Sequence, residues 1–370
     1  MVDILPEQPR KGRGAIGNPT GRFEPQTRHR IDDGWQRHTA ALPADDDAAL
    51  PPLQTVVTPE AARAVITRNT SPDIPFDRSI NPYRGCEHGC VYCFARPTHA
   101  YMGLSPGLDF ESQLFAKTDA PAVLERELRK PGYRCGVIAI GTNTDPYQPI
   151  EKEHRIMRGI LEVLAAFRHP VSIVTKSALV LRDLDILAPM AAQGLASVGV
   201  SVTTLDGDLA RCMEPRAATP LRRLATLRAL SAAGVPTTVM AAPMIPGLND
   251  DELEAILTAA RDCGVRCAGY VLLRLPLELK ELFEGWLAHH RPDRASRVLS
   301  LIRQCRDGCL YDSSFGGRMR GQGPYADLLA SRFAAACRRL GIDTRRAHDA
   351  GLDCSRFHPP PKIGDQLTLL

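Results

Sequence analysis

Hydrophobic positions along the chain follow two alternating patterns, and together they predict a layered α/β fold. Short β-rich apolar runs precede longer stretches in which apolar residues recur every three or four positions. Gly194, Gly234 and Gly264 stand where three of the expected helices end. Strands and helices that alternate with short links favour a parallel sheet with right-handed crossovers.

The expected strands number about six between residues 79 and 275, which predicts a partial, open (β/α)6 barrel. They cover residues 79–83, 137–140, 171–175, 197–203, 236–240 and 269–273. The expected helices cover residues 152–168, 179–193, 218–233 and 249–262. In such barrels the carboxyl ends of the strands carry the chemistry, so polar residues at those ends are the candidate site residues.

Both ends of the chain lack this rhythm. Residues 1–60 are rich in Pro, Gly, Arg and Asp and predict an irregular N-terminal extension. Residues 61–290 form the expected barrel core, and residues 291–370 the expected small helical C-terminal cap. Within the cap, helical patterns at 294–306 and 325–340 are joined by a Gly-rich segment, residues 315–323.

Composition narrows the class of protein. The 370 residues are 44% hydrophobic, yet no apolar run approaches the roughly 18 residues of a membrane span, and we expect no secretory signal. The 11 cysteines are irregularly spaced, so a reduced, cytoplasmic protein is expected rather than a disulfide framework. The net charge of +4 is mild, but arginines gather in residues 10–37 and 318–356.

The densest chemical signal is Cys86-x3-Cys90-x2-Cys93, with Tyr92 directly before the third cysteine. Three soft thiolate ligands on one tight loop suit an iron–sulfur cluster. A four-iron cluster would then keep one iron free of protein ligands. The alternative is a zinc site with His88 as the fourth ligand, although structural zinc usually takes two separated pairs of ligands.

This spacing is similar to the signature of the radical S-adenosylmethionine (SAM) superfamily. The resemblance implies that Cys86, Cys90 and Cys93 ligate a 4Fe–4S cluster and that SAM binds its open iron. It implies reductive cleavage of SAM to a 5′-deoxyadenosyl radical, with Tyr92 near the adenine. It also implies a reductant such as flavodoxin or ferredoxin.

Polar residues at three further strand ends are candidate SAM contacts. Gly141, Thr142 and Asn143 stand where radical SAM proteins usually carry the Gly-rich segment that holds the methionine amino group. Lys176 is a candidate partner of the SAM carboxylate, and Ser201 of its ribose or carboxylate. The alternative for residues 141–143 is a turn before a helix. The alternative for Lys176 is an exposed lysine, and that for Ser201 is a hydroxyl bonded to backbone within the core.

Within the superfamily, residues 75–275 resemble the spore photoproduct lyase-like branch. The segments that carry this resemblance are residues 81–86, 93–96, 144–149 and 175–177, and residues 11–15 and 21–24 resemble an uncharacterised bacterial subgroup. The lyases carry a hydrogen-donating cysteine beside the Gly-rich segment, where this chain has Thr142. This departure speaks against photoproduct repair.

Two functions of different classes therefore compete. The first is a radical SAM enzyme, lyase-like or with other radical chemistry, and nucleic acid is its favoured substrate class. The second is a zinc- or cluster-stabilised nucleic-acid-binding protein without turnover.

The pairs Cys263/Cys267 and Cys305/Cys309 are expected to pack in the core rather than bind a second cluster. We expect no contact with a membrane. The sequence does not determine the oligomeric state or the hydrogen donor.

Overall fold

A seven-stranded sheet forms the centre of the protein. The computed structural model describes residues 7–27, 29, 31, 52–344 and 351–361, and the strand order of its main sheet is β10-β9-β8-β7-β6-β3-β2. The strands are β2 (Ile66–Arg68), β3 (Arg78–Ile80), β6 (Ile138–Ile140), β7 (Val171–Thr175), β8 (Ala196–Ser201), β9 (Thr237–Met244) and β10 (Cys267–Leu272). The six strands from β3 to β10 are parallel, and β2 pairs antiparallel with β3. The sheet is open, so the prediction of a partial α/β barrel is confirmed.

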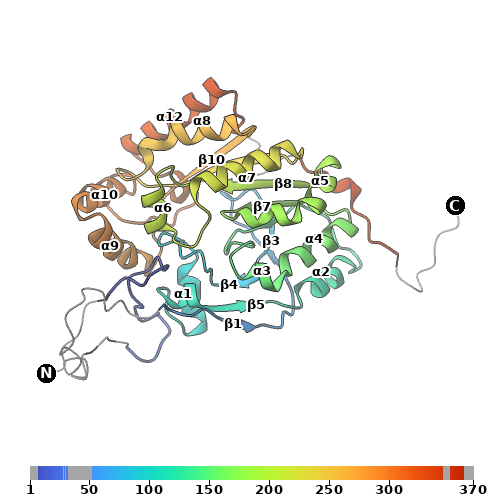
Figure 1. Cartoon of the computed structure of the whole chain (residues 1–370), viewed down its shortest axis with the longest axis horizontal. Helices are drawn as coiled ribbons and strands as arrows, with labels where there is room; N and C mark the ends of the chain where they lie inside the picture. The colour runs from blue at the N-terminus through green and yellow to red at the C-terminus, as the bar shows by residue number, and fades with distance from the viewer. Residues whose placement is uncertain (1–6, 28, 30, 32–51, 345–350, 362–370) are drawn as a thin grey trace.

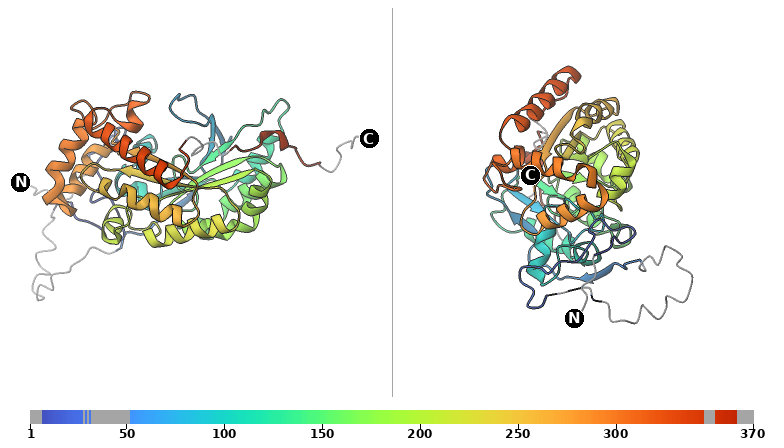
Figure 2. Two further views of the ribbon diagram at one scale, coloured as in Figure 1. Left: turned by 90° about the horizontal axis from the view of Figure 1, so that it is seen from above. Right: turned by 90° about the vertical axis from the view of Figure 1, so that its left-hand side faces the viewer.

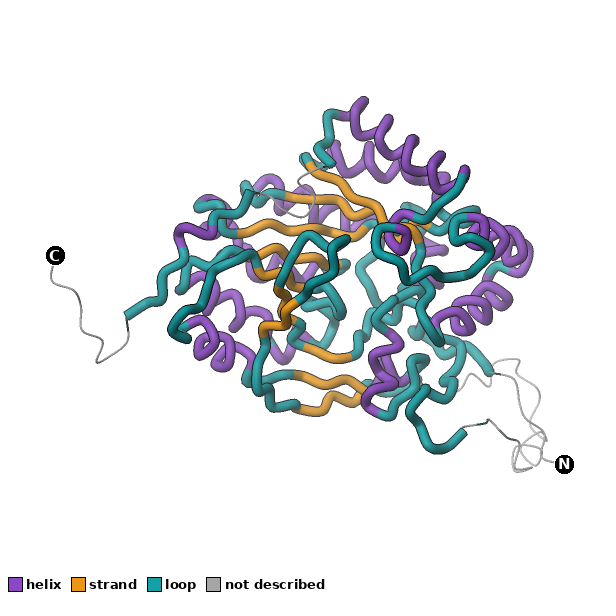
Figure 3. The backbone as a smooth tube through the Cα atoms, turned by 180° about the vertical axis from the view of Figure 1, so that it is seen from behind, coloured by secondary structure: helices purple, strands orange, loops and turns teal. Residues whose placement is uncertain are grey.

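Helices that connect the parallel strands cover one face of this sheet (Figures 1 and 3). They are α3 (Glu151–His154), α4 (Ile156–Ala166), α5 (Leu184–Ala192), α7 (Pro220–Ala232) and α8 (Leu253–Asp262). Gly194, Gly234 and Gly264 adopt φ angles of 72°, 77° and 90° just beyond α5, α7 and α8. Glycine tolerates this left-handed conformation, which confirms the three predicted helix ends.

The two faces of the sheet differ in the size of their side chains. Ile138, Ile140 and Ile173 point toward the helices and are fully buried. Because successive side chains of a strand alternate, Ala139, Ser172 and their neighbours point to the opposite face. The residues on that face are mostly small or hydroxylated: Ser79, Ala139, Ser172, Ser197, Gly199 and Thr238. That face is therefore not filled by bulky side chains, unlike the interior of a closed barrel.

A second sheet, in the order β1-β5-β4, lies beside the first (Figure 1). Its strands are β1 (Val56–Pro59), β4 (Tyr83–Arg84) and β5 (Gln113–Ala116), and α1 (Asp109–Ser112) and α2 (Ala120–Leu128) flank β5. Strand β1 lies inside the range that the sequence predicts to be irregular. It carries no apolar alternation, and its pairing with β5 gives it its extended form.

The C-terminal part is helical, as predicted. It contains α9 (Leu279–His290), α10 (Pro292–Gln304), α11 (Gly317–Arg320) and α12 (Pro324–Leu340), while α6 (Gly207–Met213) follows β8. Short 3-10 helices are η2 (Arg96–Met102), η3 (Ala178–Asp183), η4 (Asp250–Glu252) and η5 (Cys354–Arg356). Helix α12 packs along α8 (Figure 2), and Arg332 pairs with Glu254 at 2.6 Å between them. Within the described ranges, no helix has the length and apolar character needed to cross a membrane.

An ion pair bridges the open side of the main sheet. Arg318 lies on α11, which packs against the edge strand β10, and Asp73 lies in the connection between β2, the other edge strand, and β3. Arg318 donates to Asp73 through Nε at 2.7 Å and Nη2 at 2.5 Å, and the Gly316 amide adds a third bond at 3.1 Å. We call this contact the Asp73–Arg318 clasp, because it joins the two ends of an unclosed sheet.

Candidate functional site

Three free cysteines lie on one tight loop after β4. Cys86 and Cys90 are each 7% exposed, and Cys93 is half-buried. The Gly89 amide donates to the Cys86 carbonyl at 3.3 Å, and the Cys93 amide donates to the Cys90 carbonyl at 3.2 Å. These turns keep all three thiols within one short stretch of backbone, as the spacing predicts.

A buried arginine, Arg96, holds the cysteine loop through hydrogen bonds to its backbone. Arg96 is fully buried, and its guanidinium donates to the Cys90 carbonyl at 2.8 Å and to the Gly89 carbonyl at 3.1 Å. The same guanidinium pairs with Glu111, which is also fully buried. A buried charge needs such a partner and such hydrogen bonds, so Arg96 and Glu111 hold the loop in one conformation.

The N-terminal segment of residues 13–19, here called the N-terminal strap, also rests on this loop (Figure 1, deep blue). The amides of Gly14 and Ala15 donate to the Glu111 carboxylate at 2.9 and 2.8 Å, and Arg13 donates to the Glu111 carbonyl at 2.6 Å. Sequence reasoning missed this contact. The glycines of residues 11–15 were its only signal, because close packing of backbone on backbone favours glycine.

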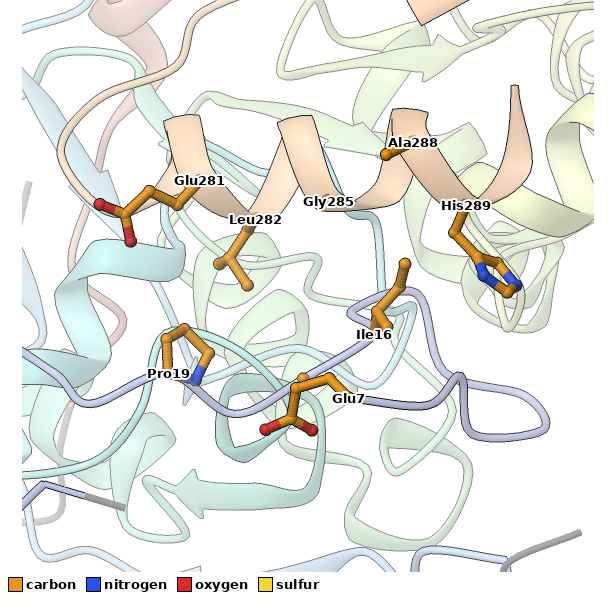
Figure 4. A pocket seen from close by; sticks show the side chains of 9 residues that line it. Glu7, Ile16, Pro19, Glu281, Leu282, Gly285, Ala288 and His289 are labelled. Carbon is orange, nitrogen blue, oxygen red and sulfur yellow. The ribbon is translucent and has the colours of Figure 1, made fainter. Parts of the chain in front are cut away.

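A groove of about 480 Å³ separates the N-terminal strap from α9 (Figure 4). Glu7, Ile16 and Pro19 line one side, and Leu282 and His289 of α9 line the other. None of the predicted cluster or SAM residues lines this groove.

The segment after β6 packs tightly against β7. Gly141 has a φ of 88°, and a Cβ there would lie 2.0 Å from the carbonyl oxygen of Val174, so only glycine fits. Asn81 accepts a bond from the Asn143 amide at 3.1 Å. Thr142 and Asn143 line a second groove, of about 450 Å³, together with Ser79 and Asn81. Two predicted SAM contacts therefore border open space at the carboxyl end of β6.

Asp145 links this segment to the cysteine loop. Its carboxylate accepts bonds from the Thr175 hydroxyl and the Lys176 amide, both at 2.7 Å, and lies 3.4 Å from Nδ1 of His88. Burial disfavours its charge, but His88 and these hydrogen bonds lower the pKa of Asp145 to about 2. His88 is thus held by Asp145. The Asp145 oxygens therefore bind neighbouring protein groups.

Lys176 reaches from the end of β7 to the cysteine loop. Its Nζ lies 5.7 Å from the centre of the Tyr92 ring, and the Tyr92 hydroxyl donates to Glu214. Burial opposes the charge of Lys176, but the nearby Cys90 and Glu214 raise the pKa of its ammonium. The sequence predicted Lys176, Tyr92 and Cys90 as site residues, and the structure brings all three together.

Glu214 is a functional candidate outside the predicted site residues. Its carboxylate is 2% exposed, pairs with Arg223 and lies 3.4 Å from the Thr203 hydroxyl. The Cys90 thiol lies 3.9 Å from its Oε2 atom. Glu214 therefore positions Tyr92 beside the cysteines. No local sequence motif indicates this role, because the partners of Glu214 come from separate elements.

The hydroxyls at the end of β8 are bonded to backbone. Ser201 donates to the Ala242 carbonyl at 2.9 Å, and Thr203 donates to the same oxygen at 3.3 Å. The Asn249 amide group donates to the Thr203 carbonyl at 2.7 Å. These bonds join the ends of β8 and β9, which is the alternative considered for Ser201. A contact between Ser201 and SAM stays a prediction.

The remaining predicted cysteines lie apart from the loop. Cys305 and Cys263, which directly follows α8, are buried in the main core as expected, and Cys267 is half-buried. Cys309 is exposed, so the expectation that it packs in the core is wrong. Across the described part of the chain, no group of three His, Cys, Asp or Glu side chains is arranged to hold a single metal ion. A 4Fe–4S cluster takes one thiolate per iron, so its ligands need not converge on one atom. Three thiols of the soft type on one buried loop fit such a cluster.

Comparison with known proteins places the chain in a family. Residues 80–260 match the Radical SAM superfamily. An uncharacterized protein of Mycobacterium tuberculosis is 40% identical over 294 residues, which cover 73% of this chain and 85% of the relative. An uncharacterized protein of Methanocaldococcus jannaschii is 31% identical over 173 residues, which cover 47% of this chain and 62% of that one.

The fold is also similar to solved structures. Spore photoproduct lyase complexed with dinucleoside spore photoproduct has a TM-score of 0.55 and 15% identity over 77% of this chain and 80% of that one. A mutant lyase with bound AdoMet and the same dinucleoside has a TM-score of 0.54 and 14% identity, with the same coverage. At this identity the likeness concerns the fold. The superfamily match and the relative at 40% identity show that this chain belongs to the radical SAM superfamily, whose enzymes use a 4Fe–4S cluster and SAM for radical chemistry.

Proposed function

We propose that the protein cleaves SAM reductively at a 4Fe–4S cluster held by Cys86, Cys90 and Cys93. The observation that supports this most directly is the meeting of Lys176 and Tyr92 with Cys90 at the carboxyl end of the parallel strands. A ligand at this place would lie where open α/β sheets bind their substrates. When bound, the cluster supplies one electron, which breaks the bond between sulfur and C5′ of SAM and yields methionine and a 5′-deoxyadenosyl radical.

The residues of the chain hold and orient the cofactors in this proposal. Lys176 binds the carboxylate of SAM, because an ammonium is a compact charge suited to it. The backbone of Gly141 and the side chains of Thr142 and Asn143 face its amino group, and Ser201 lies toward its ribose. Tyr92 packs near the adenine. Arg96, Glu111 and Asp145 keep the cysteine loop in place through the hydrogen bonds described above.

A nucleic acid is the proposed substrate class, and flavodoxin or ferredoxin the proposed class of reductant. The fold supports this substrate class, because a solved structure of similar fold contains a dinucleoside spore photoproduct. This support is an analogy between folds. The reaction itself depends on the residues of the site.

The test is SAM cleavage by the anaerobically reconstituted protein. We expect about four irons and four sulfides per chain, and release of 5′-deoxyadenosine after addition of SAM and dithionite. The control is the same protein reconstituted with zinc, which has no redox chemistry and should release none. A protein that binds zinc, retains no iron and releases no 5′-deoxyadenosine would contradict the proposal.

A further inference from the structure

Arg274 lies at the edge of the proposed site, two residues beyond the end of β10. Its Cζ atom lies 4.8 Å from the centre of the Phe94 ring. Phe94 directly follows Cys93 and is 42% exposed, although it is a large aromatic residue. A cation thus stacks on an exposed ring next to the cysteine loop.

The guanidinium of Arg274 has little to bind within the protein. Nη1 contacts only the sulfur of Met319, at 3.7 Å, and Nε is buried without a hydrogen-bond partner in the described ranges. No carboxylate of the described residues forms an ion pair with Arg274, whereas nearby Arg318 is paired with Asp73. An arginine carries five N–H donors, so most of those of Arg274 remain available to a ligand.

Arg306 adds a second positive charge next to Arg274. It is 2% exposed, and it donates to the carbonyls of Leu273 and Arg318, both at 2.9 Å, and of Gly317 at 2.5 Å. These bonds fix the end of β10 to the Gly-rich segment, and no described carboxylate pairs with Arg306. Burial lowers the pKa of Arg306, Cys305 and Asp312 partly offset this effect, and the charge of Arg274 adds to it. The region therefore carries two neighbouring cations that form no ion pair among the described residues.

We propose that Arg274 binds a phosphate group of the substrate, with the open surface of the Phe94 ring as a platform for the adjoining base. The inference rests on the proposed function and names the group that this site recognises. A guanidinium binds phosphate through two parallel hydrogen bonds, and aromatic rings and arginines are the usual partners of unpaired bases. Arg306 binds the backbone carbonyls of Leu273 and Arg318, and its charge strengthens the positive potential around Arg274. The phosphate belongs to a nucleic-acid strand or to a free nucleotide, which share this chemistry.

The Asp73–Arg318 clasp explains why Arg274 stays available while Arg318 does not. Arg318 is occupied by two bonds to Asp73, and it holds α11 across the open side of the sheet. Met319, the next residue on α11, is the one that touches Arg274. The clasp therefore fixes one wall beside Arg274 and leaves the guanidinium itself free for the substrate.

The test measures binding of a fluorescein-labelled single-stranded thymidine decamer to the reconstituted holoenzyme by anisotropy at several salt concentrations. Arg274→Gln should weaken binding at least tenfold and reduce the slope of log Kd against log salt by about 0.7, the value for one phosphate contact on a single strand. Arg274→Lys should lose less, because it keeps the charge. Arg320→Gln, which removes an exposed cation from the neighbouring Gly-rich segment of residues 315–323, should change Kd less than twofold.

Competition with thymidine 5′-monophosphate separates the two sources of phosphate. Displacement of the decamer at micromolar concentrations indicates a free nucleotide, and its absence indicates a strand. Either result supports the phosphate site if Arg274→Gln weakens that binding at least tenfold. The proposal is overturned if neither probe binds the wild-type protein, or if Arg274→Gln binds both normally.

Iron content and SAM cleavage without the decamer keep this test independent of the proposed function. Iron content should be equal in the wild type and in Arg274→Gln, because Arg274 is no cluster ligand, and SAM cleavage is followed in the wild type. Loss of iron in the variant would make Arg274 a support of the cysteine loop and overturn the phosphate site. Normal SAM cleavage without binding of either probe would leave the proposed function standing and refute only this inference.

Discussion

Gly14 and Gly89 lie so close together that a Cβ on Gly14 would fall 1.8 Å from the carbonyl oxygen of Gly89. Gly14 belongs to the N-terminal strap and Gly89 to the cysteine loop between Cys86 and Cys90. Both meet the buried Glu111, which accepts the Gly14 amide and pairs with Arg96. A segment distant in sequence thus contributes directly to the shape of the proposed cluster site.

Replacement of Gly14 by alanine should disturb the cluster site. The added methyl group cannot fit, so the strap or the cysteine loop must shift. We expect Gly14→Ala to retain less than half of the wild-type iron after reconstitution and to lose SAM cleavage in proportion. Gly207→Ala is the matched control, because a Cβ there meets nothing within 4 Å. Equal iron in the two variants would show that the strap does not shape the loop.

The three loop cysteines should act as a unit. Replacement of any one of Cys86, Cys90 or Cys93 by alanine should remove most of the iron and abolish release of 5′-deoxyadenosine, because a cluster bound by two thiolates is labile. Iron and sulfide analysis with absorption spectroscopy measures this. A double replacement of Cys305 and Cys309 should leave both readouts nearly unchanged. Equal iron loss from that second pair would refute a single cluster.

Lys176 should determine the affinity for SAM. If it binds the SAM carboxylate, Lys176→Ala should weaken SAM binding by roughly 1.5–3 kcal/mol, the range for a hydrogen bond to a charged group. Equilibrium dialysis with labelled SAM measures the change, and iron content should stay at the wild-type value. Lys152→Ala, at an exposed position, is the control. An unchanged affinity in Lys176→Ala would remove Lys176 from the SAM site.

His169 should make the fold sensitive to acid at a distance from the site. Burial lowers the pKa of His169 to about 4, and its ring bonds to Tyr133 at 2.8 Å and to the Pro170 carbonyl at 3.0 Å. The unfolded chain takes up a proton near pH 6.5, so this stability is full above that pH and declines as pH falls toward 4. The loss at pH 5 should be about 2 kcal/mol.

Denaturant unfolding at pH 7 and pH 5 measures the contribution of His169. His169→Gln keeps polar atoms near Tyr133 but does not titrate, so its difference between the two pH values should be smaller than that of the wild type. An equal difference in both proteins would assign the acid sensitivity to other groups.

Thr142 should prevent efficient repair of the spore photoproduct. Its O–H bond is too strong to return a hydrogen atom as a thiol does, so we expect 5′-deoxyadenosine but little thymine from photoproduct-containing DNA with SAM and dithionite. Chromatography of the digested DNA measures both products. Complete repair over many turnovers would contradict this expectation and point to another donor, such as Cys212 or Tyr147.

The amino-acid sequence by itself determined the order of strands and helices and the position of the cysteine loop. Strand and helix periods are local properties, so the six parallel strands and the helix ends at Gly194, Gly234 and Gly264 could be predicted. The spacing of Cys86, Cys90 and Cys93 is local as well. The weakest predictions were those without a local pattern, such as strand β1, which depends on pairing with β5.

Only the tertiary structure decided what surrounds the loop. Gly14 meets Gly89, Glu214 meets Tyr92, and Asp73 meets Arg318, and each pair joins segments far apart in the chain. Such contacts depend on which buried charges find partners and where backbones can approach, and neither is set by spacing along the sequence. The physical reason is that burial and charge pairing are properties of the folded packing, whereas periodicity and ligand spacing are properties of the chain.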